Sequence, residues 1–369
     1  MTRTKLHDLL DAGQSAWLDY IQRSLVTSGD LQKYVDQGLR GITSNPTLFD
    51  EAIAKTSDYD EQIHALALQG KSAQEIYEEL TIEDARMAAE VLRPIFDETN
   101  GNDGFFSLEV SPHLAHDTQG TIEEAIRLFA LVDRPNVMVK VPATPEGIPA
   151  FQSLIEEGIN INVTLMFSLA QYDAIAEAYL AALERRAEYA YDPKQIASVA
   201  SIFVSRLDTK VDKLLDTFEN PPAQALKGKI GIANAKMAYQ HFKEYFSSER
   251  WQRLASNGAR IQRVLYGSTG TKNPSYSDVM YVENLIGPDT VNTIPPKTLK
   301  AFMDHGTVAP TLEQGIDEAH QELHSLPEFG INLYDVTQEL LDEGVENFSK
   351  SYDSLMKTIT EKKAELIHT

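Results

Sequence analysis

Eight short apolar runs recur along the chain, and amphipathic segments lie between most of them. The runs are rich in β-branched residues, which is typical of buried strands. They cover residues 16–21, 39–44, 104–110, 136–143, 159–166, 197–205, 262–269 and 290–294. Strands that alternate with helices favour a parallel sheet. Eight such units predict an α/β fold closed into a (β/α)8 barrel, rather than an open sheet.

The segments between these runs carry helix signals. Thr121-x-x-Glu124 and Ser168-x-x-Gln171 each match the capping box that begins a helix. We expect extra helices at three places: before the first strand, after the second strand and beyond Pro295. The pattern of residues 46 to about 98 predicts two helices, whereas a barrel needs only one between two strands. The chain beyond Pro295 is predicted to be helical to its end.

The C-terminal region, residues 295–369, is predicted to be a helical extension that packs on the barrel. We expect one domain over residues 1–369, because no low-complexity linker and no convincing repeat interrupts the sequence. The predicted packing face of the extension consists of Val336, Leu340, Val345, Phe348, Tyr352, Leu355 and Ile359.

Composition excludes several kinds of chemistry. The chain has 369 residues, 42% hydrophobic and 24% charged, which is ordinary for a globular protein. It contains no Cys, which excludes a disulfide, a thiol nucleophile and a zinc–thiolate site. The sequence has no apolar stretch of membrane-spanning length and no signal-peptide core, so we expect a cytoplasmic protein.

Charge narrows the expected partners. The net charge is −22, from 55 acidic and 33 basic residues, so the surface repels nucleic acid and anionic membranes. We expect neither as a partner. A phosphate-bearing ligand would have to be held by local cations against the overall field. The sequence is compatible with a monomer or a homodimer.

Lys140 interrupts the apolar run of residues 137–143. Lys is almost never fully buried without a partner. If the amine projects from the strand into a dry pocket, desolvation favours its neutral form, which can attack a carbonyl and form a Schiff base. The alternative is a Lys at a strand end whose amine reaches water.

Polar or aromatic residues also stand where the other strands end. In chain order, the candidates are Asp19, Asn45, Glu109, Lys140, Asn162, Thr164, Ser201, Phe203, Arg206 and Ser268. A barrel exposes the C-terminal ends of its strands at its mouth, where barrel enzymes carry their chemistry. Simpler explanations exist for single residues: Asn45 before Pro46 suits a turn, and Arg206 can pair with Asp208.

Signals for a cofactor or a metal are weak. No Gly-x-Gly-x-x-Gly follows the first strand, which weakens a dinucleotide site. His113, His116 and Asp117 follow the third strand, but no further strong ligand is adjacent and their spacing fits a loop. We therefore expect no metal and no organic cofactor.

A resemblance to the transaldolase family rests on four segments. They are residues 41–49 (Gly-Ile-Thr-Ser-Asn-Pro-Thr-Leu-Phe), 137–143 around Lys140, 160–168 (Asn-Ile-Asn-Val-Thr-Leu-Met-Phe-Ser) with Gln171, and 201–208 (Ser-Ile-Phe-Val-Ser-Arg-Leu-Asp). They occur in the family's order. The family consists of class I aldolase-type (β/α)8 barrels, which move a three-carbon dihydroxyacetone unit between sugar phosphates in the pentose phosphate pathway.

The resemblance implies a catalytic role for four residues. Lys140 would form a Schiff base with the C2 carbonyl of a ketose phosphate. Glu109 would transfer protons through a water molecule positioned by Thr164. Asp19 would take the proton of the C4 hydroxyl as the C3–C4 bond breaks, leaving dihydroxyacetone bound as an enamine.

The resemblance also implies binding roles. Asn45 and Asn162 would hold substrate hydroxyls, Ser201 the C1 end, and Arg206 the phosphate. The implied donors are fructose 6-phosphate or sedoheptulose 7-phosphate. The implied acceptors are aldose phosphates such as erythrose 4-phosphate or glyceraldehyde 3-phosphate.

The loop after the seventh strand departs from the best-known family pattern. Many members carry an Arg shortly after the Ser that matches Ser268. This chain instead has Ser-Thr-Gly-Thr-Lys, which ends at Lys272 and resembles a longer variant of the family. Lys binds phosphate as a point charge, without the fork of Arg. Ser268 and Lys272 are therefore weaker phosphate candidates than Arg206.

Two other functions fit parts of the sequence. Fructose-6-phosphate aldolases that resemble this family release dihydroxyacetone to water, and they tend to have Tyr where this chain has Phe203. Phe203 therefore favours transfer over release. A non-catalytic barrel that only binds sugar phosphates would be expected to lack Lys140, Glu109 or Asp19, and all three are present.

Overall fold

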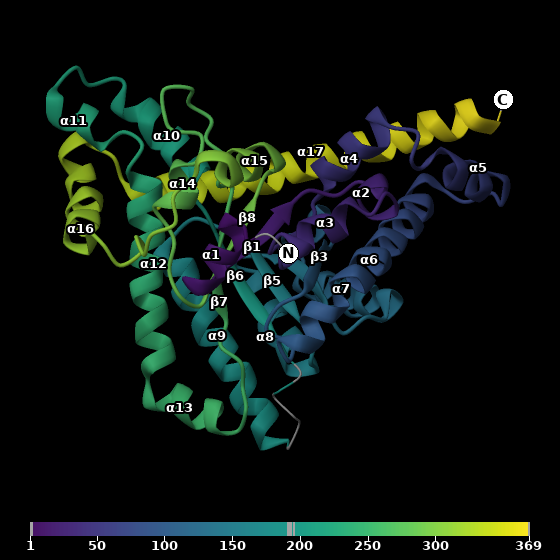
Figure 1. Cartoon of the computed structure of the whole chain (residues 1–369), viewed down its shortest axis with the longest axis horizontal. Coiled ribbons are helices and arrows are strands. Elements are labelled where there is room, and N and C mark those ends of the chain that lie inside the picture. The colour runs from purple at the N-terminus through teal and green to yellow at the C-terminus, as the bar shows by residue number, and fades with distance from the viewer. Residues whose placement is uncertain (1–2, 190–193, 195, 368–369) are drawn as a thin grey trace.

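The computed structural model describes residues 3–189, 194 and 196–367, and its parallel strands close into a barrel (Figure 1). The strands follow one another around the barrel in chain order, and β8 pairs with β1. They are β1 (Gln14–Asp19), β2 (Gly41–Thr43), β3 (Phe105–Glu109), β4 (Val137–Pro142), β5 (Ile161–Met166), β6 (Ser198–Phe203), β7 (Arg263–Gly267) and β8 (Thr290–Ile294). The predicted (β/α)8 barrel is confirmed, and each predicted run overlaps one strand.

Helices surround the barrel and cover both of its ends. They are α1 (Lys5–Asp11), α2 (Arg23–Thr27), α3 (Asp30–Asp36), α4 (Pro46–Lys55), α5 (Asp60–Leu68), α6 (Ala73–Glu98), α7 (Thr118–Val132), α8 (Gly147–Glu157), α9 (Leu169–Glu188), α10 (Ser205–Leu215), α11 (Pro221–Leu226), α12 (Ile230–Ser247), α13 (Glu249–Ser256), α14 (Met280–Glu283), α15 (Pro296–His305), α16 (Ile316–Ser325) and α17 (Leu333–Ile367). Short 3-10 turns are η1 (Pro112–Leu114) and η3 (Leu326–Phe329).

The extra helices occur where the sequence predicts them, with two corrections of extent. The segment after β2 forms three helices, α4, α5 and α6, and not two. Among the described residues beyond Pro295, the chain is helical except for residues 306–315, which form an irregular connection before α16, and residues 330–332, which join η3 to α17. Pro310 and Gly315 in this connection interrupt the helical pattern.

The two predicted capping boxes have different outcomes. The Ser168 box is confirmed: Ser168 Oγ accepts a hydrogen bond from the Gln171 amide at 3.1 Å, and Gln171 Oε1 accepts one from the Ser168 amide at 3.1 Å. Gln171 Nε2 also donates to the Ala143 carbonyl at 2.9 Å, which ties the start of α9 to the end of β4. The register of β4 and β5 is thereby fixed at their C-terminal ends.

The predicted box at Thr121 is wrong. The N-cap of α7 is Asp117, whose Oδ1 accepts from the Gly120 amide at 2.9 Å, so the helix begins one turn earlier. Asp is an equally good N-cap, and it comes first along the chain. The Thr121 hydroxyl instead donates to the Leu114 carbonyl at 2.9 Å and fastens η1 to the helix.

Side chains inside the barrel form two levels. The N-terminal level is an apolar cluster that consists of Trp17, Phe105, Met138, Ala197, Val199, Leu265 and Val291. Along β4, Met138 and Lys140 share the inward face because strand side chains alternate. Val137, Val139 and Val141 belong to the outer core between sheet and helices. Lys140 therefore belongs to the C-terminal level of the barrel, beyond this apolar cluster.

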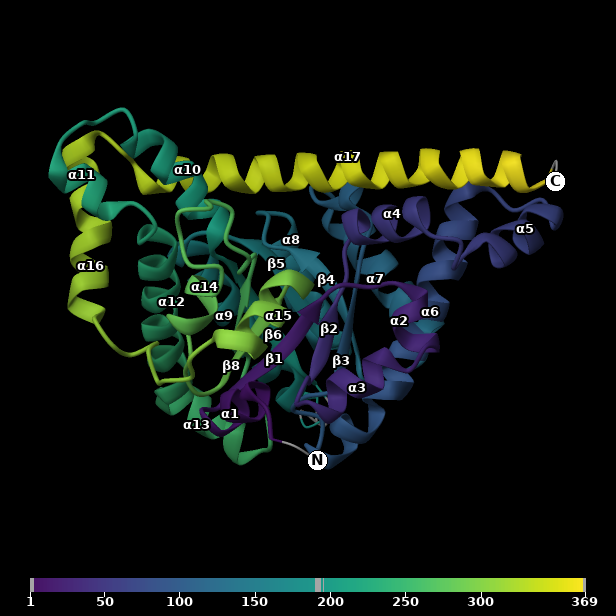
Figure 2. The same ribbon diagram turned by 45° about the horizontal axis from the view of Figure 1, so that its top comes forward.

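Helix α17 crosses the C-terminal ends of the strands (Figure 2). It contacts α4, α5, α6, α10 and β5. Its buried face contains Val336, Leu340, Phe348, Tyr352, Leu355 and Ile359, as predicted, whereas Val345 is half-buried. The C-terminal region therefore lies over the barrel mouth.

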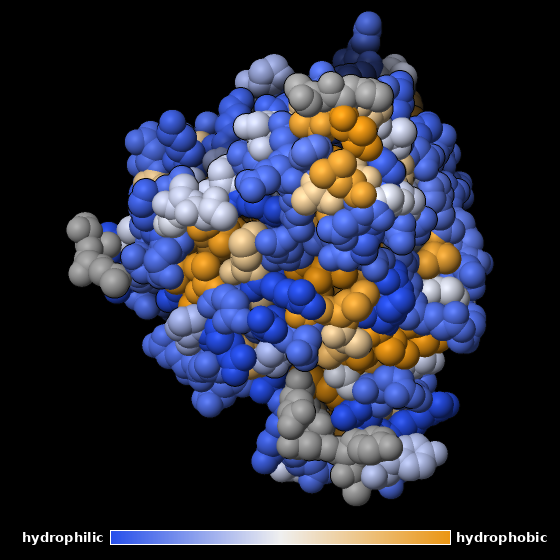
Figure 3. Space-filling model, turned by 90° about the vertical axis from the view of Figure 1, so that its right-hand side faces the viewer, coloured by the Kyte–Doolittle hydropathy of each residue, from blue (hydrophilic) through white to orange (hydrophobic). Residues whose placement is uncertain are grey.

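The surface is mostly hydrophilic on the side that lies at the right of Figure 1, where apolar residues show in separate areas between hydrophilic ones (Figure 3). Leu68, at the end of α5, is 67% exposed and is one of the few large apolar side chains that face water. Among the described helices, none is both long and apolar enough to cross a membrane.

We expect Gly147→Ala to destabilise the fold at the end of β4. A Cβ at this position would lie 2.0 Å from the Pro142 carbonyl oxygen, a backbone atom that cannot move alone. The overlap should lower the free energy of unfolding by roughly 3 kcal/mol, measured by urea denaturation. Turnover should fall as well, because β4 carries Lys140.

Gly70→Ala is the matched control. Gly70 has φ +80°, but no atom lies within 4 Å of an added Cβ. Its cost is the backbone strain alone, about 1 kcal/mol. Equal losses of stability in the two variants would contradict the role of the Gly147 contact.

Candidate active site

A cavity of about 260 Å³ opens at the C-terminal ends of the strands. Ten of the residues predicted from the sequence line it: Asp19, Asn45, Lys140, Asn162, Thr164, Ser201, Phe203, Arg206, Ser268 and Lys272. Glu109 does not line it, but lies directly behind Lys140. The structure thus brings together residues from seven strands or the loops that follow them.

Lys140 lies in the middle of this site and is buried. Parallel pairing places it beside Glu109 of β3 and Asn162 of β5 in the same row of the barrel. Its Nζ donates to the Ser44 carbonyl at 3.0 Å and to Glu109 Oε2 at 3.3 Å. Only 6% of the side chain is exposed, so the alternative of an amine that reaches bulk water is wrong.

Burial raises the pKa of the Glu109 carboxyl, although the Lys140 charge opposes this rise. Burial likewise raises the pKa of Asp19, against the charges of Lys140 and Arg206 and the hydrogen bond from Thr43. Thr43 Oγ1 donates to Asp19 Oδ1 at 2.9 Å. The site therefore holds two carboxyl groups that retain a proton to higher pH than usual, which suits general acid–base chemistry.

Hydrogen bonds also fix the orientation of polar side chains on β5 and β6, next to Lys140. Ser201 Oγ donates to Asn162 Oδ1 at 2.6 Å, and Asn162 Nδ2 donates to Ser107 Oγ at 3.1 Å. These two hydrogen bonds determine which way the Asn162 amide points. Thr164 Oγ1, by contrast, is buried without a hydrogen-bonding partner among the described residues. An unpaired buried hydroxyl costs about 1–3 kcal/mol, which is a reason to assign it a ligand.

Asn45 has the structural role that its position before Pro46 predicts. It is the N-cap of α4, and its Oδ1 accepts from the Leu48 amide at 3.1 Å. The residue also borders the cavity. The cap fixes its side chain at the cavity wall, so the structural interpretation does not exclude a binding role.

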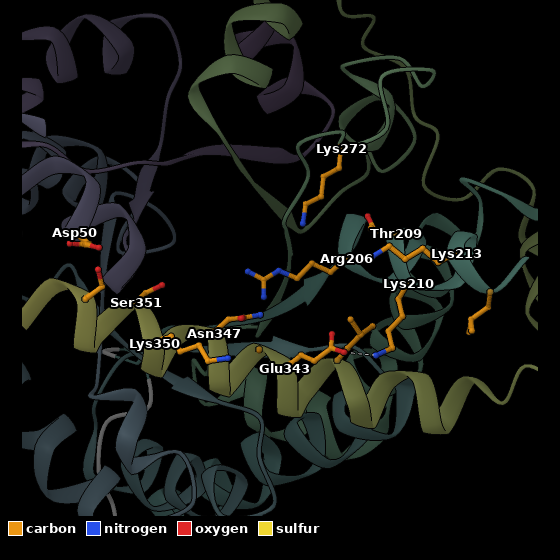
Figure 4. A pocket seen from close by; sticks show the side chains of 14 residues that line it. Asp50, Arg206, Thr209, Lys210, Lys213, Lys272, Glu343, Asn347, Lys350 and Ser351 are labelled. Carbon is orange, nitrogen blue, oxygen red and sulfur yellow. Dashed lines mark hydrogen bonds and ion pairs between the residues drawn. The ribbon is translucent and has the colours of Figure 1, made fainter. Parts of the chain in front are cut away.

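Two cations mark the outer end of the cavity. Arg206, from α10, and Lys272, from the loop after β7, also line a larger cleft of about 820 Å³ that continues toward solvent. Figure 4 shows their side chains converging on the same space above Asn347 of α17. Burial lowers the pKa of both, and for Lys272 the charges of Arg206 and Lys213 lower it further.

Neither cation forms an ion pair with a carboxylate of the described residues, in contrast with Lys210 nearby. Lys210 Nζ contacts Glu339 and Glu343 at 2.7 Å each. The alternative pairing of Arg206 with Asp208 is wrong, because no ion pair joins these two described residues; Asp208 Oδ1 instead accepts from a backbone amide of α12 at 2.6 Å. The mouth therefore carries local positive charge that suits a phosphate.

Aromatic side chains flank the arginine. The Arg206 guanidinium carbon lies 5.3 Å from the centre of the Phe203 ring and 5.8 Å from that of Phe348. Phe203 also packs edge-on against Phe167, with ring centres 5.5 Å apart. The ring of Phe203 thus closes one wall of the cavity and touches the phosphate candidate.

Ser268 follows β7 in the left-handed region, with φ +54°. Its hydroxyl lies 2.9 Å from Ser205 Oγ, at the start of α10. This contact joins the β7 loop to the helix that carries Arg206. Ser268 borders the cavity, and its hydroxyl already has one partner.

The histidines after β3 make separate contacts. His113 Nε2 lies 2.9 Å from Asp353 of α17, and His116 Nδ1 lies 3.1 Å from Glu146. Within the described parts of the chain, no cluster of three or more His, Cys, Asp or Glu side chains is arranged to hold a metal ion.

The sequence interpretation misses several residues that shape the site. Thr43, Thr293 and Phe348 line the cavity, and the Ser44 carbonyl accepts from Lys140. Thr43 and Thr293 are hydrogen-bonded to each other at 2.6 Å. Their hydroxyls, within otherwise apolar strands, could have pointed to the site from the sequence. Phe348 gave none, because it belongs to a helical packing face far along the chain.

Comparison with known proteins identifies the family to which this chain belongs. The profile of the family described as Transaldolase/Fructose-6-phosphate aldolase matches residues 16–359. A transaldolase of Trichodesmium erythraeum is 45% identical over 377 residues, covering 99% of each chain. One from Thermobifida fusca is 46% identical over 361 residues, covering 97% of this chain and 98% of the relative. One from Saccharopolyspora erythraea is 47% identical over 362 residues, covering 98% of each.

These matches extend over nearly the whole chain and include every strand of the barrel. The region they cover contains the buried lysine, both carboxyl groups and the cations at the mouth. The chain belongs to the transaldolase/fructose-6-phosphate aldolase family.

Proposed function

We propose that this chain catalyses the transaldolase reaction through a Schiff base on Lys140. A dihydroxyacetone unit passes from fructose 6-phosphate or sedoheptulose 7-phosphate to an aldose phosphate, such as erythrose 4-phosphate or glyceraldehyde 3-phosphate. The observation that carries the proposal is a buried amine beside a buried carboxyl, in a cavity with an unpaired arginine at its mouth. The family and the names of the relatives support this activity, which belongs to the pentose phosphate pathway.

The first step forms the Schiff base. Lys140 must be neutral to attack the C2 carbonyl, and Glu109 Oε2, at 3.3 Å, is placed to accept the proton of the ammonium. Attack gives a carbinolamine. Glu109 then returns a proton to the C2 hydroxyl, which leaves as water, and the imine forms. A water molecule bound to Thr164 Oγ1 relays the proton, which gives that unpaired hydroxyl its partner.

The second step breaks the C3–C4 bond. The Asp19 carboxylate takes the proton of the C4 hydroxyl, which becomes the aldehyde of the departing aldose phosphate. The electrons of the broken bond flow into the protonated imine and give an enamine that stays on Lys140. The acceptor aldehyde then binds, the enamine attacks it, and Asp19 returns the proton to the new hydroxyl. Water finally hydrolyses the product imine by the reverse of the first step, which releases the new ketose phosphate and restores the Lys140 amine.

The binding residues are assigned by depth in the cavity. Asn45, Asn162 and Ser201 hold the hydroxyls of the dihydroxyacetone unit near Lys140. The phosphate lies outward, where Arg206, Ser268 and Lys272 line the wall. The planar fork of Arg206 is the main phosphate ligand, and Lys272 adds a point charge.

Release of free dihydroxyacetone is the second candidate function, because the family includes fructose-6-phosphate aldolases. The feature that favours transfer is Phe203, whose ring has no hydroxyl to deliver a proton to the enamine. We propose that the enamine is retained until the acceptor arrives.

The same proposal extends to organisation and location. All the proposed site residues come from one chain, so a monomer and a homodimer would each carry one whole site per chain. We propose that residues 1–369 act as one domain, because α17 lies over the barrel and lines the cleft. A cytoplasmic location is proposed because doubly charged sugar phosphates do not cross an apolar bilayer unaided.

We expect borohydride reduction with fructose 6-phosphate to fix one reduced dihydroxyacetone unit on Lys140, located by peptide mass spectrometry. Lys140→Arg should give no adduct and no turnover, because a guanidinium cannot be deprotonated to attack a carbonyl. Lys140→Ala should be equally inactive, with an unchanged circular dichroism spectrum. An adduct on another lysine in the wild type would refute the assigned nucleophile.

We expect Thr43→Val to move the acid limb of the pH–rate profile upward. Asp19 acts as a carboxylate, so turnover is lost as pH falls through its pKa, which burial raises. The Thr43 hydrogen bond opposes that rise by stabilising the charged form. Without it, the pKa of Asp19 should rise further and the limb should move to higher pH. Thr293→Val is the control, since Thr293 is hydrogen-bonded to Thr43, whereas the hydrogen bond that acts on the pKa of Asp19 comes from Thr43. A downward shift, or equal shifts in both variants, would contradict the assignment of the limb to Asp19.

We expect Phe203→Tyr to increase release of dihydroxyacetone relative to transfer, measured with fructose 6-phosphate with and without erythrose 4-phosphate. The new hydroxyl can protonate the enamine. Phe203→Leu removes the ring without adding a hydroxyl and serves as the control. If both variants release dihydroxyacetone equally, loss of the ring rather than gain of a proton donor is the cause.

A further inference from the structure

Phe348 is the residue through which the C-terminal helix enters the active-site cavity. It lies in α17, is 5% exposed and lines the same cavity as Lys140 and Arg206. The barrel strands end far earlier in the chain, at Ile294. An element outside the barrel therefore supplies part of the cavity wall.

A close contact one turn earlier in α17 allows this approach. Gly344 faces the end of β5, and a Cβ there would lie 2.9 Å from Leu165 Cδ2. Leu165 directly follows Thr164 and has φ +58°, a conformation that Leu rarely adopts. The helix thus rests on a strained residue of the active-site strand, and Phe348, one turn further on, reaches over the mouth.

Arg206 depends on aromatic contacts for its orientation. Asp19 and Glu109 attract its charge through space, but no ion pair and no hydrogen bond joins its guanidinium to a described residue. Its guanidinium carbon lies over the rings of Phe203 and Phe348, at 5.3 and 5.8 Å. Both distances fall within the range of a cation–π contact, about 6 Å.

This kind of contact leaves the arginine available to a ligand. A carboxylate would neutralise the charge and occupy the N–H donors, as Glu339 and Glu343 do for Lys210. An aromatic face restricts the plane of the guanidinium while the N–H donors at its edge stay free. The arrangement suits a ligand that can present two acceptor oxygens to the edge of the guanidinium, such as a phosphate.

We propose that Phe348 is a positioning residue that holds the Arg206 guanidinium for the phosphate of the substrate. Docking of α17 over the barrel and capture of the phosphate are thereby coupled. The proposal rests on the proposed function in one respect: Arg206 binds the sugar phosphate.

The test uses the full-length protein and Phe348→Leu, which removes the ring but keeps an apolar side chain. Binding of inorganic phosphate is measured by calorimetry, and kcat and KM are measured with fructose 6-phosphate. We expect phosphate affinity to fall and KM to rise by about 2- to 30-fold, the size of one cation–π contact. At saturating substrate, kcat should stay within about twofold. Phe348→Tyr, which keeps the ring face, should restore both values.

Tyr352→Leu is the matched control for a merely structural role. Tyr352 lies one turn further along the same buried face of α17, and it packs against Tyr77 and His113, each at 5.5 Å. The variant removes a packing ring of α17 that does not contact Arg206, and it leaves Phe348 in place, so phosphate affinity should stay unchanged. In an Arg206→Met background, Phe348→Leu should have no further effect on phosphate binding.

The outcomes separate this proposal from the proposed function. Equal loss of phosphate affinity in Phe348→Leu and Tyr352→Leu, no loss in Phe348→Leu, or a loss that persists without Arg206 would each overturn the positioning role. Borohydride trapping of the wild type tests the reaction independently. A protein that shows the Phe348 effect but forms no Lys140 adduct would retain the positioning role and lose the transaldolase mechanism.

Discussion

The contact of Lys140 with Glu109 is the constraint on which the rest of the site depends. Both side chains are 6% exposed, and their charged atoms lie 3.3 Å apart. A buried ion pair seldom stabilises a fold more than apolar residues of similar volume would, because desolvation offsets the attraction. Its presence in a barrel otherwise filled by Trp17 and Phe105 is therefore explained by chemistry rather than by stability. In the proposed mechanism, Glu109 exchanges protons with an amine that must be neutral when it attacks the carbonyl and whose nitrogen is protonated once it has become the imine.

The position of this pair separates two kinds of electrostatics along the cavity. Near Lys140 the ionisable neighbours are acids, Asp19 and Glu109, and burial favours their protonated forms. Toward solvent the neighbours are the unpaired cations Arg206 and Lys272, in a protein whose net charge is −22. A sugar phosphate has the matching polarity, with a neutral carbonyl end and a dianionic end. In the proposed mechanism, this match of charge orients the substrate.

Features that depend on residues close together in the sequence could be predicted more readily than features that depend on contacts between distant residues. Strand positions follow from short apolar runs, and Lys140 was visible because a charge inside such a run is unusual. Once a closed barrel is predicted, the neighbours of Lys140 can be predicted too, because the strand register places Glu109 on one side of it and Asn162 on the other. The start of α7 was missed because Asp117 and Thr121 are both competent caps, and tertiary contacts decide between them.

Phe348 was predicted only as part of a packing face, because its contact with Arg206 joins residues that are distant in sequence. Such a contact is set by how α17 docks, and that depends on Gly344 meeting Leu165. The docking has a second consequence in the proposed mechanism. The enamine survives only if it is kept from proton donors until the acceptor binds, and excluding water is the usual means. Phe203 and Phe348 are both buried and both form the outer wall. In the proposed mechanism, the two rings that orient the phosphate ligand therefore also shield the intermediate from water.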